Sequence, residues 1–218
     1  MTFPIILCSF GGDQMKRLGA IFVALLFLGA TVPEVSAGDL LNYFWDTRTY
    51  QHPYPTDVRP GDLVYGHSPD LFNAIIPGYW IHVAIVAWYN ESIDDWMVIE
   101  AKIGKGIIIT PLSEFLSRYD VVALQRVKVS DEIRLRAVQF AYQQLGKPYN
   151  YDYFSKPKVY DDRYYCSQLV WAAYLVASNF RVNLDENDGG WSWKYFYAVA
   201  PQEVYDDPMT YTIYYHKA

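Results

Sequence analysis

The stretch 80–102 constrains the fold of this 218-residue chain more than any other. Residues 80–89 form an apolar run rich in β-branched and aromatic side chains, and residues 96–102 form a second one. The segment between them, 90–95, is short and polar, as turns are. Two such runs around a short polar segment predict a β-hairpin, whose strands are neighbours and run antiparallel.

Short strands and two helices surround this hairpin. Apolar or alternating runs predict strands at 63–67, 107–110 and 121–129, and a short helix or turn at 111–119. The clearest helix is 131–145, because Ser130 can cap its start and Gly146 can end it. A second helix is expected at about 167–177, and the aromatic tail 191–215 is expected to be extended. No repeat, linker or second domain is evident.

His82 and Glu100 are the polar side chains of interest in the hairpin. Strand alternation puts His82 on the face opposite Ile81, Val83 and Ile85. Glu100 falls near the same end of the adjacent strand, although a one-residue slip in register would separate the two faces. An unpaired buried carboxylate is costly, so Glu100 needs a partner, and His82 is the nearest candidate. The alternative for His82 is a half-buried histidine with a purely structural role.

Cys166 lies where an aromatic segment turns into the second helix, within 164–171. A thiol at a helix start meets unpaired backbone N–H groups and the positive end of the helix dipole, and both favour the thiolate. With the base and the carboxylate of the hairpin, it would complete the set used in cysteine acyl transfer. The alternative is a small buried hydrophobe. Tyr165 and Ser167 flank the thiol and could contact substrate or only pack.

The N-terminus resembles a secretory signal peptide. Lys16 and Arg17 precede the apolar run 18–30, and small residues end at Ala37, where a signal peptidase could cleave. The run is shorter than the ~20 apolar residues of a spanning helix. The mature chain, residues 38–218, is therefore expected to be one domain that is secreted or extracytoplasmic and has no stable transmembrane span. The alternative is an uncleaved signal anchor.

Cysteine usage follows from the position of this signal. Met15 fits the start of a signal peptide better than Met1, and Cys8 would then be absent or removed by cleavage. Cys166 is the one cysteine expected in the mature chain, so no disulfide can form within it. A lone thiol in an oxidising compartment is a candidate reactive group.

Charge and composition exclude several function classes. A formal net charge of −6 and the lack of a basic stripe argue against a nucleic-acid partner. The four histidines, at 52, 67, 82 and 216, do not have metal-ligand spacing, and the sequence predicts neither a metal nor a cofactor. The 21 tyrosines and 7 tryptophans suit half-buried strands, or else an aromatic ligand groove.

Five segments, in this order along the chain, carry a resemblance to a known family. They are Pro60-Gly61-Asp62-Leu63-Val64, His82-Val83-Ala84-Ile85-Val86, Val98-Ile99-Glu100-Ala101, Gly146-Lys147-Pro148-Tyr149-Asn150 and Tyr165-Cys166-Ser167-Gln168-Leu169-Val170. They resemble the circularly permuted papain-fold amidases of the YiiX-like group, relatives of the NlpC-type cell-wall peptidases. The resemblance covers about residues 58–178. It implies an α+β fold, in which a small antiparallel barrel or sheet packs against the helix that carries the nucleophilic cysteine.

The same resemblance implies roles for the site residues. Cys166 would be the nucleophile, His82 the general base and Glu100 the residue that orients the base. The backbone N–H of Cys166 and one unassigned donor would bind the oxyanion. Gln168 departs from the family pattern, which has an acidic residue at this position, and the departure would affect substrate choice.

Three functions are compatible with these features. The leading hypothesis is an exported cysteine hydrolase that cleaves a peptide-like amide through a thioester, on a cell-envelope substrate. The second uses the same triad on a lipid, as an acyl amidase or acyltransferase. The third is an aromatic-rich binding domain that keeps the fold without the chemistry.

Overall fold

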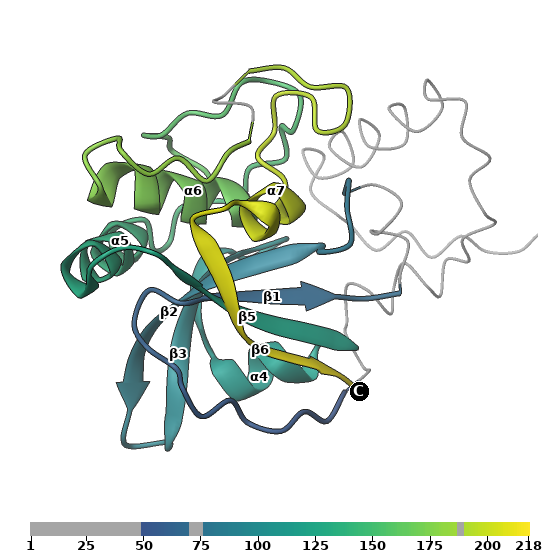
Figure 1. The fold of residues 1–218 in the computed structure, drawn as a ribbon, viewed down its shortest axis with the longest axis vertical. Helices are drawn as coiled ribbons and strands as arrows, with labels where there is room; N and C mark the ends of the chain where they lie inside the picture. The colour runs from purple at the N-terminus through teal and green to yellow at the C-terminus, as the bar shows by residue number, and fades with distance from the viewer. Residues whose placement is uncertain (1–48, 70–75, 187–189) are drawn as a thin grey trace, which may run out of the picture. The chain divides into compact units, whose positions relative to one another are not determined.

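A computed structural model describes residues 49–69, 76–186 and 190–218 (Figure 1). All of them belong to the unit Asn42–Ala218. The elements, in chain order, are β1 (Leu63–His67), β2 (His82–Asn90), β3 (Asp95–Lys102), β4 (Gly106–Pro111), α4 (Leu112–Ser117), β5 (Val121–Val127), α5 (Asp131–Gln143), α6 (Cys166–Ala177), α7 (Pro201–Asp206) and β6 (Thr210–Lys217). The architecture is α+β, as expected.

The strands form one six-stranded antiparallel sheet in the order β4-β3-β2-β1-β5-β6. The predicted hairpin is confirmed: β2 and β3 pair from Asn90 and Asp95 at the turn to Ile85 and Ile99. Asp94 helps the chain to reverse there, with a left-handed φ of 55°. The hairpin therefore carries His82 and Glu100 at its open end.

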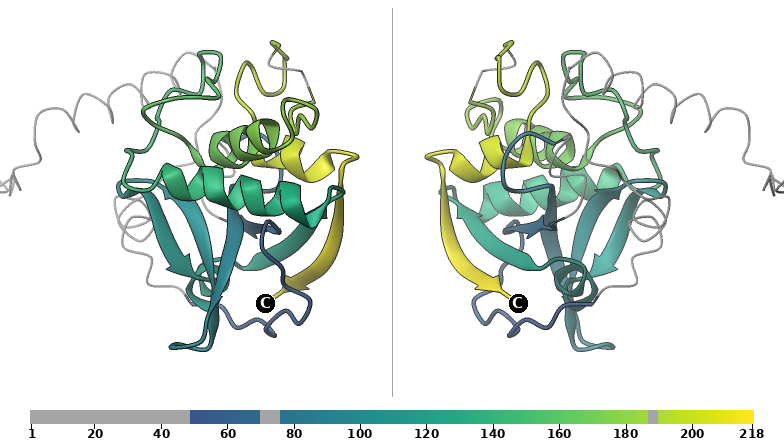
Figure 2. Two further views of the ribbon diagram at one scale, coloured as in Figure 1. Left: turned by 90° about the vertical axis from the view of Figure 1, so that its left-hand side faces the viewer. Right: turned by 90° about the vertical axis from the view of Figure 1, so that its right-hand side faces the viewer.

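Alternation along these strands makes two hydrophobic layers. Val83, Ile85 and Ile99 belong to the larger core, which α5 and α6 complete on one face of the sheet. Ala84 and Val98 belong to a smaller core on the other face, together with the side chains of α4. Figures 1 and 2 show α5 and α6 together on one side of the sheet. The sheet is thus buried on both faces over β2 and β3, so that polar side chains there need partners.

Both predicted helices form, and local signals set their starts. α5 begins after Ser130, whose hydroxyl accepts a hydrogen bond from the Ile133 N–H at 3.4 Å. α6 begins at Cys166 itself, and Tyr165 precedes it in an extended conformation. α6 is almost wholly buried against α5 and β2. A residue at the first position of this helix is therefore fixed relative to the strands.

The expectation of an extended tail was wrong in part. Residues 201–206 form the short helix α7, and only 210–217 form a strand, β6. Pro201 starts the helix rather than interrupting a strand, because the first helical position does not need the N–H that proline lacks. The Glu203 carboxylate accepts from the Ala200 N–H at 2.7 Å and closes the first turn.

Several predictions fall outside the described residues. These are the secretory signal, its cleavage near Ala37 and the choice between Met1 and Met15 as the start. The single domain over 38–218 also stays a prediction. Within the described ranges, no helix combines the length and the apolar character that a membrane crossing requires.

Candidate active site

Cys166 occupies the first turn of α6, where the backbone N–H groups have no partner within the helix. Its side chain is buried, and the residue is only 4% exposed. The Tyr165 N–H at the helix start donates to the Gln168 side-chain oxygen at 3.3 Å, which fixes the entry into the helix. The thiol is therefore held rigidly at the positive end of a 12-residue helix.

His82 is the first residue of β2 and bridges the thiol and the carboxylate. Its Nε2 lies 2.8 Å from Glu100 Oε2, so the register of the hairpin brings the two side chains to the same face. His82 also shares a side-chain hydrogen bond with Cys166, and Nδ1 is the ring nitrogen that Glu100 does not occupy. The ring also lies nearly parallel to Phe115 of α4, at a centroid distance of 5.6 Å. Two contacts thus fix the plane of the imidazole.

The thiol and the imidazole shift each other toward the ionised pair. Burial by itself raises the pKa of Cys166, but the His82 imidazolium and the Val83 backbone N–H lower the pKa below its ordinary value. Burial by itself lowers the pKa of His82, yet the Cys166 thiolate and the Glu100 carboxylate raise it to about 9. A thiolate–imidazolium pair is consequently favoured between these two ionisations.

Glu100 is fully buried and surrounded by donors. Arg118 Nη2 lies 2.8 Å from Oε1 and 2.9 Å from Oε2, and Thr110 Oγ1 donates to Oε1 at 2.6 Å. Burial alone would raise the pKa of Glu100, but Arg118 and His82 hold it well below its usual range. The carboxylate therefore stays ionised and keeps Oε2 directed at His82.

Sequence analysis did not identify Arg118 or Thr110. Thr110 could have been found from register, because Glu100 pairs with Ile108 and so lies diagonally across from Thr110 on the same face. Arg118 follows α4, and no local pattern predicts that this turn brings it over the sheet. A carboxylate accepts several hydrogen bonds, so a buried Glu100 needs more donors than His82 alone can supply.

Tyr165 and Ser167, the predicted substrate contacts, are both buried and both bonded to Val199. The Val199 N–H donates to the Tyr165 hydroxyl at 3.0 Å, and the Ser167 hydroxyl donates to the Val199 carbonyl at 2.7 Å. These bonds tie the segment before α7 to the residues on either side of Cys166. They favour an anchoring role, and substrate contact by either side chain stays a prediction.

Gln168, the departure from the family pattern, faces the loop that leads into α6. Its oxygen accepts from Asn150 Nδ2 at 3.1 Å, and its Nε2 donates to the Lys158 carbonyl at 3.0 Å. The side chain is fully buried. An amide serves this position because it accepts and donates at once, whereas a carboxylate could only accept.

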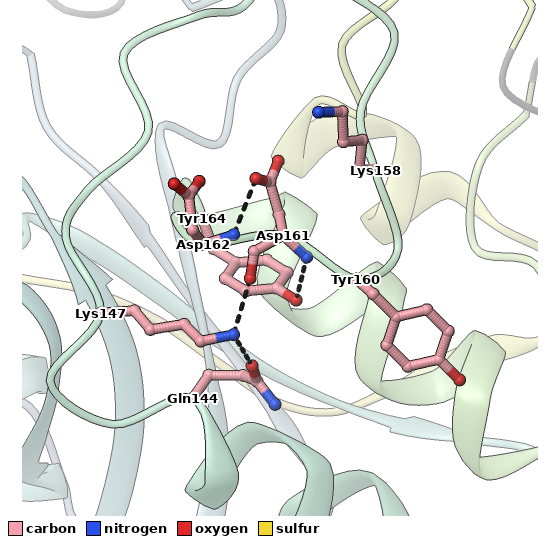
Figure 3. A pocket seen from close by; sticks show the side chains of 7 residues that line it. All are labelled: Gln144, Lys147, Lys158, Tyr160, Asp161, Asp162 and Tyr164. Carbon is pink, nitrogen blue, oxygen red and sulfur yellow. Dashed lines mark hydrogen bonds between the residues drawn. The ribbon is translucent and has the colours of Figure 1, made fainter.

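A hollow of about 520 Å³ lies beside this loop, and neither Cys166 nor His82 lines it (Figure 3). Lys147 points from its wall toward the Gln144 side chain, at 2.5 Å, and toward the Asp161 carbonyl, at 2.6 Å. The Asp161 N–H donates to the Tyr164 hydroxyl at 2.9 Å. These contacts connect the end of α5 to the loop before the nucleophile, and the hollow that they line is not part of the candidate site.

The other three histidines have different partners. His67 Nδ1 lies 2.7 Å from Asp120 Oδ1, and its ring stacks on Tyr79. His52 and His216 contact each other through their Nδ1 atoms at 2.9 Å. Of the four histidines, His82 is the one joined to both a thiol and a buried carboxylate.

Comparison with known families decides where this chain belongs. Residues 57–214 match the model of the permuted papain-like amidase enzymes of the YaeF/YiiX, C92 family. The chain is a member of this family. The match spans every element from β1 to α7 and the first part of β6, and it contains Cys166, His82 and Glu100. This permuted papain-like amidase is accordingly an enzyme, as the sequence predicted.

A solved structure supports the fold of this amidase. It is a crystal structure of the metalloprotein YiiX from Escherichia coli O157:H7, at 22% identity and a TM-score of 0.57. The similarity covers 75% of this chain and all of that one. At this identity the likeness concerns the fold. A search of curated proteins finds no match.

Proposed function

We propose that this amidase hydrolyses its substrate through a Cys166–His82–Glu100 triad and a thioester intermediate. The observation that carries the proposal is the hydrogen bond between His82 Nε2 and the buried Glu100 carboxylate at 2.8 Å. That bond fixes the tautomer and the plane of the ring, and it leaves Nδ1 for the thiol at the start of α6. An orienting group, a base and a nucleophile are thereby aligned from three different elements.

The first half-reaction begins from the thiolate–imidazolium pair. Cys166 Sγ attacks the amide carbonyl carbon, a C–S bond forms, and the carbonyl electrons move to oxygen. The backbone N–H of Cys166 is one donor for this oxyanion. As the tetrahedral intermediate collapses, His82 gives its proton to the leaving nitrogen, the C–N bond breaks, and the amine departs from a thioester.

The second half-reaction regenerates the enzyme. His82, now neutral, takes a proton from water while the water oxygen attacks the thioester carbonyl. The C–S bond then breaks to release the carboxylic acid, and the thiolate is again paired with the imidazolium. Glu100 stays ionised throughout and stabilises the charge that His82 gains and loses.

The substrate is proposed to be a peptide-like amide in the cell envelope, with the protein exported by its N-terminal signal. The amidase family supports an amide substrate. The basic pair, apolar run and small residues that end at Ala37 support export. YiiX is described as a metalloprotein. Among the residues described for this chain, no three His, Cys, Asp or Glu side chains are grouped to hold a metal ion, and the proposed steps use none.

A second candidate, an acyl amide or lipid substrate, is favoured by exposed aromatic side chains on the loops that precede and follow α6 in the chain. Trp193 is 87% exposed, and Trp191 and Phe154 are also exposed. The loops that carry these residues are each tied to Tyr165, the residue before the nucleophile: Val199 is bonded to the Tyr165 hydroxyl, and the Tyr153 ring contacts the Tyr165 ring. Aromatic rings around an active site suit an apolar chain.

The test is a comparison of the full-length chain with its Cys166→Ser variant on peptide amides and on long-chain N-acyl amides. We expect the wild type to release amine and the variant to lose at least about 10³-fold in kcat/KM. Mass spectrometry of quenched reactions should find the acyl group on the peptide that contains Cys166. Equal rates for the two proteins, both correctly folded by circular dichroism, would refute the triad.

The choice between the two substrates needs a separate variant. Trp193→Ala should raise KM for long-chain N-acyl amides several-fold and leave KM for short peptide amides unchanged if the lipid candidate is correct. If Trp193→Ala and the wild type have the same KM on long-chain N-acyl amides as well as on short peptide amides, the aromatic side chains no longer support the lipid candidate.

A further inference from the structure

The buried carboxylate of Glu100 is held by a residue on a third element. Arg118 Nη2 reaches both Glu100 oxygens, at 2.8 and 2.9 Å, and the Arg118 side chain is only 8% exposed. Thr110 takes a further position on Oε1 at 2.6 Å. The position that remains on Oε2 is filled by His82 Nε2 at 2.8 Å. The carboxylate therefore has no freedom to turn away from the histidine.

Arg118 and His82 also lie on the same aromatic surface. The Arg118 guanidinium carbon is 5.0 Å from the Phe115 ring centroid and 5.6 Å from that of Tyr119. The His82 ring is nearly parallel to these two rings, at 25° and 23°. Any movement of this surface would change the position of the cation and of the imidazole together.

The ionised states of the four groups balance. Glu100 and the Cys166 thiolate carry negative charge, whereas Arg118 and the His82 imidazolium carry positive charge. Without Arg118, one buried positive charge would face two negative ones in a medium where uncompensated charge is costly. The guanidinium therefore favours the state in which the carboxylate and the thiolate are ionised at once.

The protein keeps this guanidinium at a cost. Arg118 Nε is buried without a hydrogen-bond partner among the residues that the structure describes. An unsatisfied buried donor costs about 1–3 kcal/mol. An arrangement that was optimised only for stability would remove such a group or pair it, and departures of this kind are expected at functional sites.

We infer that Arg118 is a positioning residue of the amidase reaction: it holds Glu100 ionised and aimed at His82, and thereby supports the ionised Cys166–His82 pair. Arg118 does not contact the reacting atoms and acts through Glu100. The inference rests on the proposed triad. Two other charged groups lie near Arg118. Lys102 on β3 is one, and its pKa is lowered by burial and then by Arg118. Glu114 on α4 is the other.

The experiment measures the rate of Cys166 alkylation by iodoacetamide as a function of pH in the full-length chain. Peptide mass spectrometry reads the label on Cys166 separately from any label on Cys8. In the wild type, we expect the midpoint of the acid limb to lie well below the ordinary thiol value of about 8.5. In Arg118→Gln, we expect this midpoint to rise by about one pH unit, because a nearby positive charge is lost.

Two further variants separate charge, geometry and general damage. Arg118→Lys keeps the charge but cannot fork across two oxygens. The midpoint of Arg118→Lys should lie within about 0.3 pH units of the wild-type midpoint. Its kcat/KM should fall roughly tenfold, because one charge-assisted contact to Glu100 is weakened. Arg136→Gln removes an arginine from an exposed Arg136–Glu132 pair on α5 and should change neither quantity.

The outcomes are distinguishable. If the wild-type midpoint lies at the ordinary thiol value, the proposed triad fails, and the inference fails with it. If the wild-type midpoint is low but Arg118→Gln leaves it unchanged in a folded protein, the triad stands and the role of Arg118 is overturned. Should Arg118→Gln not fold, Arg118→Lys decides: a kcat/KM equal to that of the wild type would overturn the positioning role.

Discussion

Two buried acid–arginine clusters lie in the same sheet, and they differ in what completes them. In the Glu100 cluster, the donors to the carboxylate are Arg118, Thr110 and His82. In the Asp62 cluster, Arg126 binds both oxygens of Asp62 at 2.8 Å, and the Arg59 N–H donates to one of them at 2.8 Å. Both carboxylates are fully buried.

The difference lies in one donor. All donors to Asp62 are arginine or backbone groups, which do not titrate near neutral pH. Arg126 also donates to the carbonyl of Asp57, so the hydrogen bonds of its guanidinium all go to structural partners. One oxygen of Glu100 instead binds His82, and His82 in turn contacts the Cys166 thiol. The same residue pair is therefore structural where every donor is inert and suited to chemistry where one donor can exchange its proton.

The largest expected effect separates the clusters by activity. His82→Gln keeps an amide donor toward Glu100 but removes proton transfer, so kcat/KM should fall by about 10³-fold. The urea midpoint should change little, because Arg118 and Thr110 still bind the carboxylate. Amine release and urea titration on the same preparation measure both quantities. A variant that lost stability while its folded fraction kept full activity would reverse the assignment.

The next effect separates them by stability. Asp62→Asn turns an amide NH2 group toward an N–H of Arg126, so that a buried donor of Arg126 loses its acceptor, which lowers the free energy of unfolding by about 1–3 kcal/mol. Arg126 keeps the exposed Asp57 carboxylate as a charge partner. Activity per folded molecule should stay near that of the wild type, because no group of the proposed triad contacts Asp62. Chemical denaturation gives the first quantity, and active-site titration of Cys166 normalises the second. A large fall in normalised kcat/KM would show that the two clusters are coupled.

The pH dependence of stability sharpens the comparison, since the two acids have shifts of opposite sign. The pKa of Glu100 is lowered on folding. Its ionised form therefore adds to the free energy of unfolding above the unfolded pKa of about 4.5, and this stabilisation is lost as the pH falls toward the folded pKa. Burial raises the pKa of Asp62 although Arg126 lowers it, so folding favours the protonated form. The contribution of Asp62 to the free energy of unfolding therefore grows as the pH falls below its folded pKa.

The measurement compares wild type with Glu100→Gln and with Asp62→Asn in urea between pH 7 and pH 4. The stability gap to Glu100→Gln should narrow as the pH falls below about 4.5, and the gap to Asp62→Asn should widen. If both stability differences change in the same direction with pH, the pKa values of the two carboxylates do not shift in opposite directions on folding.

The smallest effect comes from an acid–arginine pair outside both clusters. Arg136 and Glu132 lie 2.7 Å apart on the surface of α5, in an i,i+4 arrangement. Arg136→Ala should lower the free energy of unfolding by no more than about 0.5 kcal/mol, because water screens exposed pairs. Its activity should equal that of the wild type. A change as large as that of Asp62→Asn would show that burial is not what distinguishes the clusters.

Much of the fold could be predicted because its signals are local. The hairpin follows from two apolar runs and a polar turn, and the start of α5 follows from Ser130 and the acidic residues after it. The tail was harder, because an aromatic segment with two prolines, Pro201 and Pro208, is typical of an extended chain, whereas the Glu203 cap helps residues 201–206 to form a helix. A capping contact three residues away decided between the two readings.

The site divides in the same way. The sequence by itself determined which groups can react: a lone thiol at a helix start, a histidine on an apolar strand, and a carboxylate that needs a partner. Tertiary structure alone decided that Arg118 and Thr110 complete the Glu100 cluster and that Tyr165 and Ser167 are bonded to Val199. Periodicity and capping depend on residues a few positions apart, whereas these contacts depend on strand register and on how α4, α6 and the tail pack against the sheet.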